Sequence, residues 1–254
     1  MAVKLSVTII THNEEENIAG CLESVKWANE IIVVDSGSTD NTVDIAKGYT
    51  DKVIHNAWNG YAAQKSFALN QATNEWVLSL DADERVTEEL KNEIENNNLS
   101  EADGYYLKRR NYFLDKVVTS CGWGRDRQLR LFRKSKTKLT DNLVHEGFVV
   151  SGKISKLNGE LIHYTHTDLK KTFEKVNNYS SLEAEEKHAR KTATGFWIFF
   201  YPAIAFFQHY FLRKGFTDGV HGLMVSLIHA MTKMQAIMKM WEIKNVKKTP
   251  QSNK

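Results

Sequence analysis

One nearly continuous apolar run, Trp76 to Leu80, stops on two acids, Asp81 and Asp83, which are spaced one residue apart. Such a run is typical of a central parallel strand that is covered on both faces. In open α/β sheets, ligands bind beyond the carboxyl ends of these strands. Alternate residues of extended chain point the same way, so the two acids are placed to share one hard divalent cation, which in turn holds substrate phosphates. A solvated acidic loop is the alternative interpretation.

Two other interpretations of these acids conflict with the residues that follow. A calcium-binding loop needs an acidic or amide residue and then glycine where the chain has Arg85 and Val86. A phosphatase-type nucleophile motif favours Thr or Val at position 85 and follows the first strand, whereas this strand is about the fourth.

The composition indicates an ordered α/β protein: 254 residues with 42% hydrophobic residues and only two prolines. Cys21 and Cys121 are far apart and lie in no cluster, so neither a disulfide framework nor a zinc site is expected, and a reducing, cytosolic setting is favoured. The first residues lack the pattern of a signal peptide. The net charge of +3 hides an asymmetry, because residues 187–254 hold 11 Lys/Arg against 2 acids, and residues 1–186 hold 23 against 29.

Strand-like and helix-like segments alternate through the first half of the chain, which indicates right-handed βαβ units in a parallel sheet. The expected strands before the acids are Lys4 to Ile10, Ile31 to Val34 and Lys52 to Ile54, and the expected helices are one that begins near Glu14 and one from Tyr61 to Ala72. No dinucleotide fingerprint or P-loop occurs, so another arrangement must hold any phosphates.

Four ordered segments in the first ninety residues resemble family 2 glycosyltransferases with the GT-A fold. They are Val-Thr-Ile-Ile-Thr-His-Asn-Glu-Glu, Ile-Val-Val-Asp-Ser-Gly-Ser-Thr-Asp-Asn-Thr, Gln-Lys-Ser-Phe-Ala-Leu and Leu-Ser-Leu-Asp-Ala-Asp-Glu. The resemblance implies an inverting transferase that uses a UDP-sugar. It places Thr11, Asn13, Glu14 and Asp35 around the uridine, adds Ser36, Gly37, Gln64, Lys65 and Asp81 to the donor site, and puts Mg²⁺ or Mn²⁺ on Asp81 and Asp83. His163 or His166 is a candidate for a further metal ligand.

The later half of the chain is expected to frame the acceptor. Trp123 is a candidate for stacking on a sugar, and Arg130 for holding phosphate through its planar guanidinium, while a solvated basic loop is the alternative. Inversion requires a carboxylate that takes the proton of the acceptor hydroxyl, and Glu146 and Asp126 are the candidates. Glu146 is preferred because Gly147 permits close approach of substrate. The alternative for Glu146 is a surface acid paired with lysine.

Asp126 is the weaker candidate for the base because it lies among arginines. Arg125, Arg127 and Arg130 are its neighbours in sequence, so an ion pair with a lowered pKa is expected.

The run Trp-Gly-x-Asp-x-Gln-x-Arg-Leu-Phe, the Val-His-Glu step and the tail resemble lipopolysaccharide inner-core β-1,4-glucosyltransferases, which glucosylate heptose.

The tail combines a long uncharged stretch with flanking basic residues. Residues 192–212 carry no charge, and Lys187, Arg190, Lys191, Arg213 and Lys214 surround them. Length alone would permit a membrane span, but Pro202, the polar residues and the aromatic excess favour an element at the membrane interface. A dimer interface or packing on the catalytic domain is the alternative.

Before this stretch, core packing is predicted for a helical series formed by Leu169, Phe173, Val176, Tyr179 and Leu182.

Together these observations predict an α/β GT-A fold with a mostly parallel central sheet and a C-terminal helical, membrane-associating appendage. The expected domains are 1–167, with a nucleotide-sugar half 1–100 and an acceptor half 101–167, and 168–254. The expected activity is transfer of glucose from UDP-glucose to heptose of a membrane-anchored lipopolysaccharide core, on the cytoplasmic face of the inner membrane, with no nucleic-acid partner and with a homo-oligomer left open. The alternatives are another family 2 enzyme for capsule, teichoic acid or protein glycosylation, a nucleotidyltransferase, and a non-catalytic membrane adaptor.

Overall fold

The computed structural model describes residues 3–96, 99–139, 147–190 and 192–246. The chain forms two compact units, one of residues 1–112 and 123–165, and one of residues 113–122 and 166–254. The helical unit therefore includes a short segment, 113–122, that comes from the expected acceptor half.

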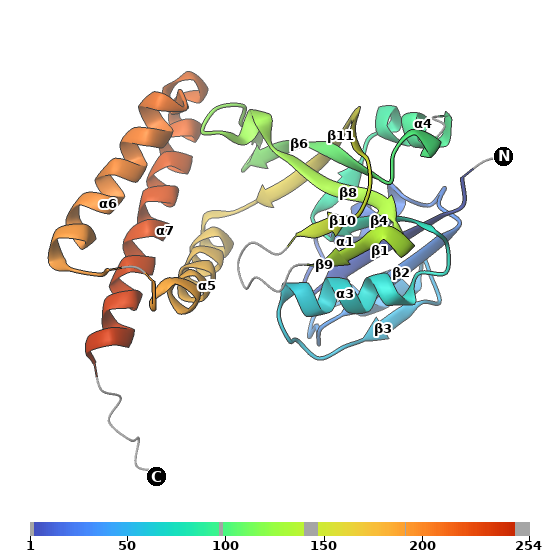
Figure 1. Cartoon of the computed structure of the whole chain (residues 1–254), viewed down its shortest axis with the longest axis horizontal. Helices are drawn as coiled ribbons and strands as arrows, with labels where there is room; N and C mark the ends of the chain where they lie inside the picture. Colours follow the sequence, from blue (N-terminus) through green and yellow to red (C-terminus); the bar gives the residue numbers. More distant parts are fainter. Residues whose placement is uncertain (1–2, 97–98, 140–146, 191, 247–254) are drawn as a thin grey trace, which may run out of the picture. The chain divides into compact units, whose positions relative to one another are not determined.

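The first unit is built on one mixed sheet (Figure 1). The strand order is β3-β2-β1-β4-β8-β6-β11-β5. The strands are β1 (Leu5–Thr11), β2 (Glu30–Asp35), β3 (Val53–His55), β4 (Trp76–Asp81), β5 (Glu84–Val86), β6 (Gly104–Phe113), β8 (Arg127–Arg133) and β11 (Ile154–His166). A separate antiparallel pair is formed by β9 (Thr137–Leu139) and β10 (Phe148–Val150).

The parallel part of the sheet is the part that the sequence pattern predicted. Strands β3, β2, β1 and β4 are parallel to one another. Strand β8 is antiparallel to β4 and β6, and β5 is antiparallel to β11. The sheet is therefore mixed, and its parallel part consists of the four strands from the N-terminal part of the chain. This arrangement puts the ends of β1, β2 and β4 at one edge, where the acids were expected.

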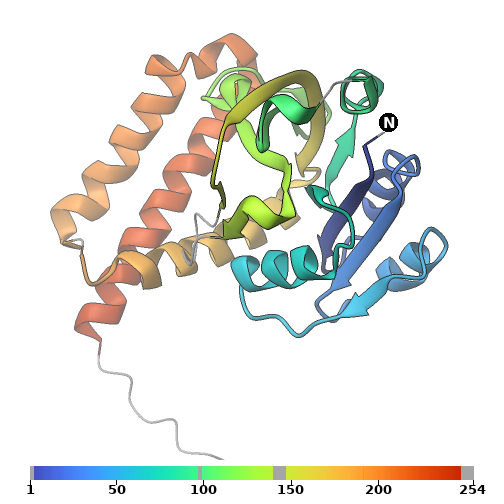
Figure 2. The same cartoon turned by 45° about the vertical axis from the view of Figure 1, so that its right-hand side comes forward.

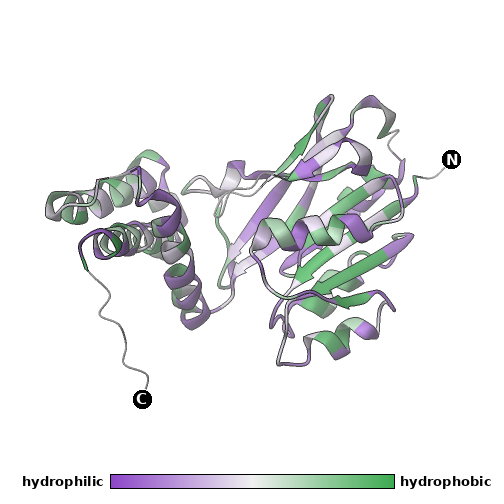
Figure 3. Cartoon of the chain, turned by 60° about the horizontal axis from the view of Figure 1, so that its bottom comes forward, coloured by the Kyte–Doolittle hydropathy of each residue, from purple (hydrophilic) through white to green (hydrophobic). Residues whose placement is uncertain are grey.

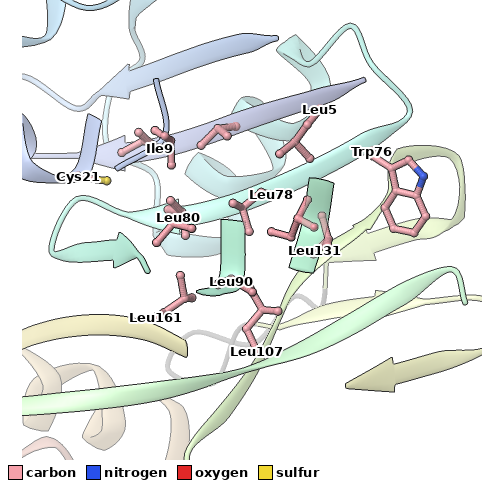
Figure 4. Close-up of a cluster of buried hydrophobic side chains, with 14 of the residues drawn as sticks. Leu5, Ile9, Cys21, Trp76, Leu78, Leu80, Leu90, Leu107, Leu131 and Leu161 are labelled. Carbon is pink, nitrogen blue, oxygen red and sulfur yellow. The ribbon is translucent and has the colours of Figure 1, made fainter. Parts of the chain in front are cut away.

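Helices cover both faces of the parallel strands. The helices of this unit are α1 (Ile18–Glu23), α2 (Thr42–Lys47), α3 (Tyr61–Gln71) and α4 (Glu88–Asn96). Leu5, Ile9, Leu78 and Leu80 pack with residues of α1 and α4, including Cys21 and Leu90 (Figure 4). On the other face, Val77 packs with Ala68 and Leu69 of α3. Hydrophobic colour follows these strands in Figure 3, as expected for strands that are buried on both faces.

The second unit is helical. It contains β7 (Lys116–Val117), α5 (Leu169–Lys187), α6 (Gly195–Phe207), a π-helical turn (Gln208–Leu212) and α7 (Gly219–Asn245). Helices α6 and α7 run side by side in Figures 1 and 2. Ala184, Ala236, Ile237 and Met240 form the small core of this unit, against which Ile198 packs. Within the described residues, no helix is both long and apolar enough to cross a membrane.

The prediction of core packing along α5 was wrong in part. Leu169 and Phe173 are exposed, and Val176 is the one residue of the predicted series that is buried. The buried stripe instead runs through Thr172, Val176, Ser180 and Ala184. These residues are small, which lets α7 approach α5 closely, so the stripe lacked the large apolar residues on which the prediction relied.

Candidate active site

Two cations hold Asp81 at the end of β4. Lys65 of α3 places Nζ 3.3 Å from Oδ1, and Arg130 of β8 donates to Oδ2. Residues alternate along β4, so Asp81 lies on the same face as Val77, which α3 covers. Burial favours the neutral carboxyl, but the charges of Arg130 and Lys65 outweigh burial and hold the pKa of Asp81 far below its ordinary value. Asp81 is therefore ionised at neutral pH.

Glu84 connects this ion pair to a second arginine. Its side chain is fully buried, and Oε1 accepts hydrogen bonds from Arg130 at 2.8 Å and from Arg109 at 3.4 Å. Oε2 accepts from the backbone N–H of Asp81 at 3.0 Å. Because ionised side chains are stable inside a protein only when they are paired, the two arginines and two carboxylates form one mutually dependent cluster.

Asp83 lies beside His163 of β11. Strand β5 pairs with β11 so that Glu84 is opposite His163, which brings the turn after β4 next to that strand. The Nε2 atom of His163 is 3.5 Å from Oδ2 of Asp83, and both residues are buried. His166, the alternative candidate, belongs to the second unit, where its Nδ1 is 3.2 Å from the hydroxyl of Thr172. The arrangement therefore favours His163 over His166 as a partner of Asp83.

Asp83 and His163 fit a divalent cation that is also bound by substrate. Two ligands that are each about 2.1 Å from one ion can lie 3.5 Å apart. Among the described residues, no group of three or more His, Cys, Asp and Glu side chains is placed to hold an ion. Both oxygens of Asp81 already contact cations. A diphosphate would thus complete the coordination, as is usual for Mg²⁺, and direct binding by Asp81 stays a prediction.

Asp126 is fixed by three donors. Oδ2 accepts hydrogen bonds from Arg109 at 2.7 Å and Asn111 at 3.2 Å, and Oδ1 accepts from Gln128 at 3.0 Å. Burial raises the pKa of Asp126, but Arg109 and these hydrogen bonds lower it by a larger amount. The pKa therefore lies below its ordinary value. Asp126 is ion-paired as expected, but its partner is Arg109 of β6, which is not among the arginines 125, 127 and 130 that the sequence suggested. A low pKa makes Asp126 a weak base. Glu146, the other candidate, lies outside the described residues.

The loops after β1 and β2 are joined by polar contacts. Asn13 accepts from the backbone N–H of Thr39 at 2.8 Å, and Glu14 donates its backbone N–H to Thr42 at 2.8 Å. Asp35 is buried and accepts the backbone N–H groups of residues 37 and 38. The Thr11 hydroxyl is buried and has no hydrogen-bond partner within the described part of the chain. The predicted uridine contacts therefore share one edge, and their roles stay predictions.

The other residues predicted for the UDP-sugar site, and Trp123, which was predicted to stack on a sugar, make structural contacts of their own. Ser36 donates its hydroxyl to the carbonyl of Thr11 at 3.1 Å. Gly37 has a φ of +95°, which favours glycine. Gln64 is buried and binds both the side chain and the carbonyl of Asn56. Trp123 is partly buried in a short 3₁₀ turn, and its carbonyl accepts from Asn111 at 3.4 Å.

The profile of the family described as Glycosyl transferase family 2 matches residues 6–162, which include Asp81, Asp83 and Asp126. The chain is a family 2 glycosyltransferase. The family resemblance of the four N-terminal segments is confirmed by this match.

Two relatives align with this glycosyltransferase over nearly its whole length. It is 32% identical to the lipopolysaccharide core biosynthesis glycosyltransferase LpsC of Rhizobium meliloti, over 97% of this chain and 95% of LpsC. It is 35% identical to an uncharacterized glycosyltransferase of Rickettsia typhi, over 94% of this chain and 87% of the relative. Among solved structures, S. aureus TarS is similar, with a TM-score of 0.48 and 16% identity over 96% of this chain and 92% of the TarS fragment.

Three residues of this glycosyltransferase site were not predicted from sequence. Glu84 directly follows Asp83, so a third acid was visible, but nothing marked it as buried. Arg109 lies in the basic run 108–110, which gave no hint of its partners. Asn111 carried no sequence signal, because its contacts are made across strands.

Proposed function

We propose that this family 2 glycosyltransferase moves glucose, with inversion, from UDP-glucose to heptose of a membrane-anchored lipopolysaccharide core in a metal-dependent reaction. The similarity to LpsC over almost the full length of both chains supports the acceptor class. The 3.5 Å approach of Asp83 to His163, at the end of β4, is the observation that carries the metal-dependent chemistry.

The residues of the site have separate roles in this proposal. Asp83 and His163 would hold Mg²⁺ or Mn²⁺. The bound ion would neutralise charge on the departing diphosphate, an effect worth several kcal/mol. Asp81 keeps the cationic groups of Lys65 and Arg130 at the strand end. Thr11, Asn13, Glu14 and Asp35 provide carbonyl, hydroxyl and carboxylate oxygens for the uracil N–H and the ribose hydroxyls.

A donor screen tests the reaction. UDP release is measured with each UDP-sugar, with Mn²⁺ or Mg²⁺, and with a heptose-containing core glycolipid. UDP-glucose with a divalent ion should give the fastest release. Asp83→Ala should reduce turnover by roughly 10²-fold or more, because it removes a carboxylate ligand of the ion. Metal-independent, undiminished transfer by Asp83→Ala would contradict the metal role.

Glu146 is proposed as the base that takes the acceptor proton. The arginine-paired Asp126 is the poorer base, because its pKa is lowered. Glu146→Gln keeps the shape and removes the proton acceptor, so it should lower kcat by roughly 10²-fold while UDP binding is unchanged. Near-normal turnover of Glu146→Gln would show that Glu146 is not the base.

Docking of α6 on an anionic membrane surface is proposed as the way in which the enzyme reaches its acceptor. One side of α6 packs through Ala205 and Ile198, while the opposite side exposes large apolar side chains. These exposed residues, which define the α6 face, are Phe196, Phe199, Phe200, Ile204 and Phe207 of α6, together with Phe211 of the π-helical turn that follows. Exposed Arg190 and Lys214 flank this face. An apolar face between basic residues fits insertion between anionic headgroups.

Flotation with vesicles of phosphatidylglycerol and phosphatidylcholine tests the docking. Phe199, which is 72% exposed, is replaced by serine, and Val149→Ser serves as the control because Val149 is 54% exposed in the first unit. Phe199→Ser should float less than the wild type, and Val149→Ser should float normally. The α6 face is a dimer interface if the wild type does not bind the vesicles at low salt and the Phe199→Ser variant has a lower molecular mass than the wild type in analytical ultracentrifugation.

A further inference from the structure

Asn111 is at the centre of the polar contacts that surround His163. It lies on β6, which neighbours β11 in the sheet, and its side chain is buried. Its Oδ1 is 2.7 Å from Nδ1 of His163, and its Nδ2 is 3.2 Å from Oδ2 of Asp126. The same Nδ2 is 3.4 Å from the carbonyl oxygen of Trp123.

The acceptors around Asn111 decide which way its amide faces. The carboxylate of Asp126 is ionised because its pKa is lowered, so it only accepts hydrogen bonds, and the carbonyl of Trp123 does the same. The NH₂ group of Asn111 must therefore face these two oxygens. Its carbonyl oxygen is left facing His163, so Nδ1 of that ring must be the protonated nitrogen that donates.

A neutral imidazole that is protonated at Nδ1 carries a lone pair on Nε2. Here that lone pair points toward Asp83, whose Oδ2 is 3.5 Å away. Two acceptor atoms that face each other at this distance are favourable only with a proton or a metal cation between them. We propose that Asn111 is a positioning residue, which keeps His163 in the Nδ1-protonated tautomer so that Nε2 and Asp83 together accept a divalent ion. This inference rests on the metal role in the proposed function.

Asp126 gains a role that differs from catalysis. It is held by Arg109 and Gln128 as well as by Asn111, so its position does not depend on Asn111. Asn111, in contrast, depends on Asp126 for the direction of its amide. Asp126 therefore acts as the anchor that orients Asn111, and through it His163. This explains why a carboxylate that is a poor base is held, partly buried, beside the site.

Three variants separate tautomer control from simple destabilisation. Asn111→Ala removes the acceptor for Nδ1 and one donor to Asp126. Gln128→Ala is the matched control, because it also removes a donor to Asp126 and leaves the contact between Asn111 and His163 in place. Asn111→Asp is the conservative variant, since an aspartate in either protonation state still accepts a hydrogen bond from Nδ1.

Nitrogen-15 NMR of the imidazole in the metal-free, full-length protein at about pH 8 reads the tautomer directly. The His163 signals are assigned by their loss in His163→Gln. The wild type, Gln128→Ala and Asn111→Asp should be protonated at Nδ1, and Asn111→Ala should shift toward the Nε2-protonated form. A wild type that is protonated at Nε2, or an Asn111→Ala with the wild-type tautomer, would overturn the inference.

Mn²⁺ affinity in the presence of UDP, measured by electron paramagnetic resonance of the free ion, gives the second readout. Loss of a hydrogen bond that orients a metal-binding histidine typically weakens binding roughly 10- to 100-fold. Asn111→Ala should show this loss, and Gln128→Ala and Asn111→Asp should stay close to the wild type. Equal weakening by Gln128→Ala would reduce Asn111 to a structural residue. A wild type that binds no Mn²⁺ would contradict the proposed function, while the NMR result would still decide the tautomer.

Discussion

Buried charge is the main feature of this site at the scale of single residues. Asp81, Glu84, Arg130 and Arg109 lie in contact, and Glu84 accepts from both arginines. Sequence reasoning identified Asp81 because it ends a recognisable apolar strand, and Arg130 because it lies in an arginine-rich segment. It did not identify Glu84 or Asn111, because a residue's partners across a sheet depend on register, which local sequence does not specify.

Glu84→Gln should lower the free energy of unfolding by about 3 kcal/mol, because it removes one charge from a buried cluster and leaves two arginines partly unpaired. Urea denaturation followed by circular dichroism measures this difference. Glu88→Gln is the control, since Glu88 is 78% exposed and pairs with Lys91, and its effect should stay within about 0.5 kcal/mol. Equal stability of Glu84→Gln and the wild type would show that the cluster tolerates the loss of this charge.

At the scale of elements, the apolar runs in the sequence predicted the parallel strands well. Four strands of the first half lie where the apolar runs placed them, because strands that are buried on both faces need continuous apolar sequence. Helix α5 was predicted less well, because its buried stripe consists of small and polar residues. The antiparallel later strands, such as β6 and β8, carry charged residues and gave weaker signals.

Glu30 ties elements together at the end of the sheet opposite the site. It is buried and accepts from Ser6 of β1, from Lys52, and from the backbone N–H of Thr73 at 2.8 Å. Burial opposes its ionisation, but the hydrogen bonds from Lys52, Ser6 and Thr73 lower the pKa of Glu30 from 4.5 to about 2. Because the folded pKa is below the unfolded one, the stabilisation is complete above about pH 4.5 and is lost as the pH falls through about 2.

Glu30→Gln tests this dependence. At pH 7 it should lower the free energy of unfolding by at most about 3 kcal/mol, the value of the full pKa shift. The difference from the wild type should shrink below about pH 4.5 and vanish near pH 2. Unfolding by urea across this pH range measures it. Glu23→Gln, at a 59% exposed side chain, should give no such trend. A difference that is constant with pH would mean that the hydrogen-bond geometry, not the charge, carries the effect.

At the scale of the whole molecule, charge and apolar surface are divided along the chain. Residues 187–254 hold 11 Lys/Arg against 2 acids, and the α6 face lies within them, while the site of Asp81, Asp83 and His163 belongs to the first unit. Sequence reasoning predicted this division from charge counts and the uncharged stretch alone. It did not predict which residues of the stretch are exposed, because that depends on how α6 packs on α7.

If docking on lipid and catalysis are separate functions of the two units, they should separate in kinetics. Phe199→Ser should raise the KM for core glycolipid in phosphatidylglycerol vesicles several-fold and leave kcat unchanged, because the loss lies in reaching the surface. The same variant should match the wild type on a water-soluble, delipidated core oligosaccharide. Added salt should raise the vesicle KM of the wild type toward that of the variant, since attraction to anionic lipid is screened. Asp83→Ala should instead lose turnover on both acceptors alike. Loss of kcat on the soluble acceptor in Phe199→Ser would show that the α6 face supports the catalytic unit itself, and the proposal that it serves only for docking would fail.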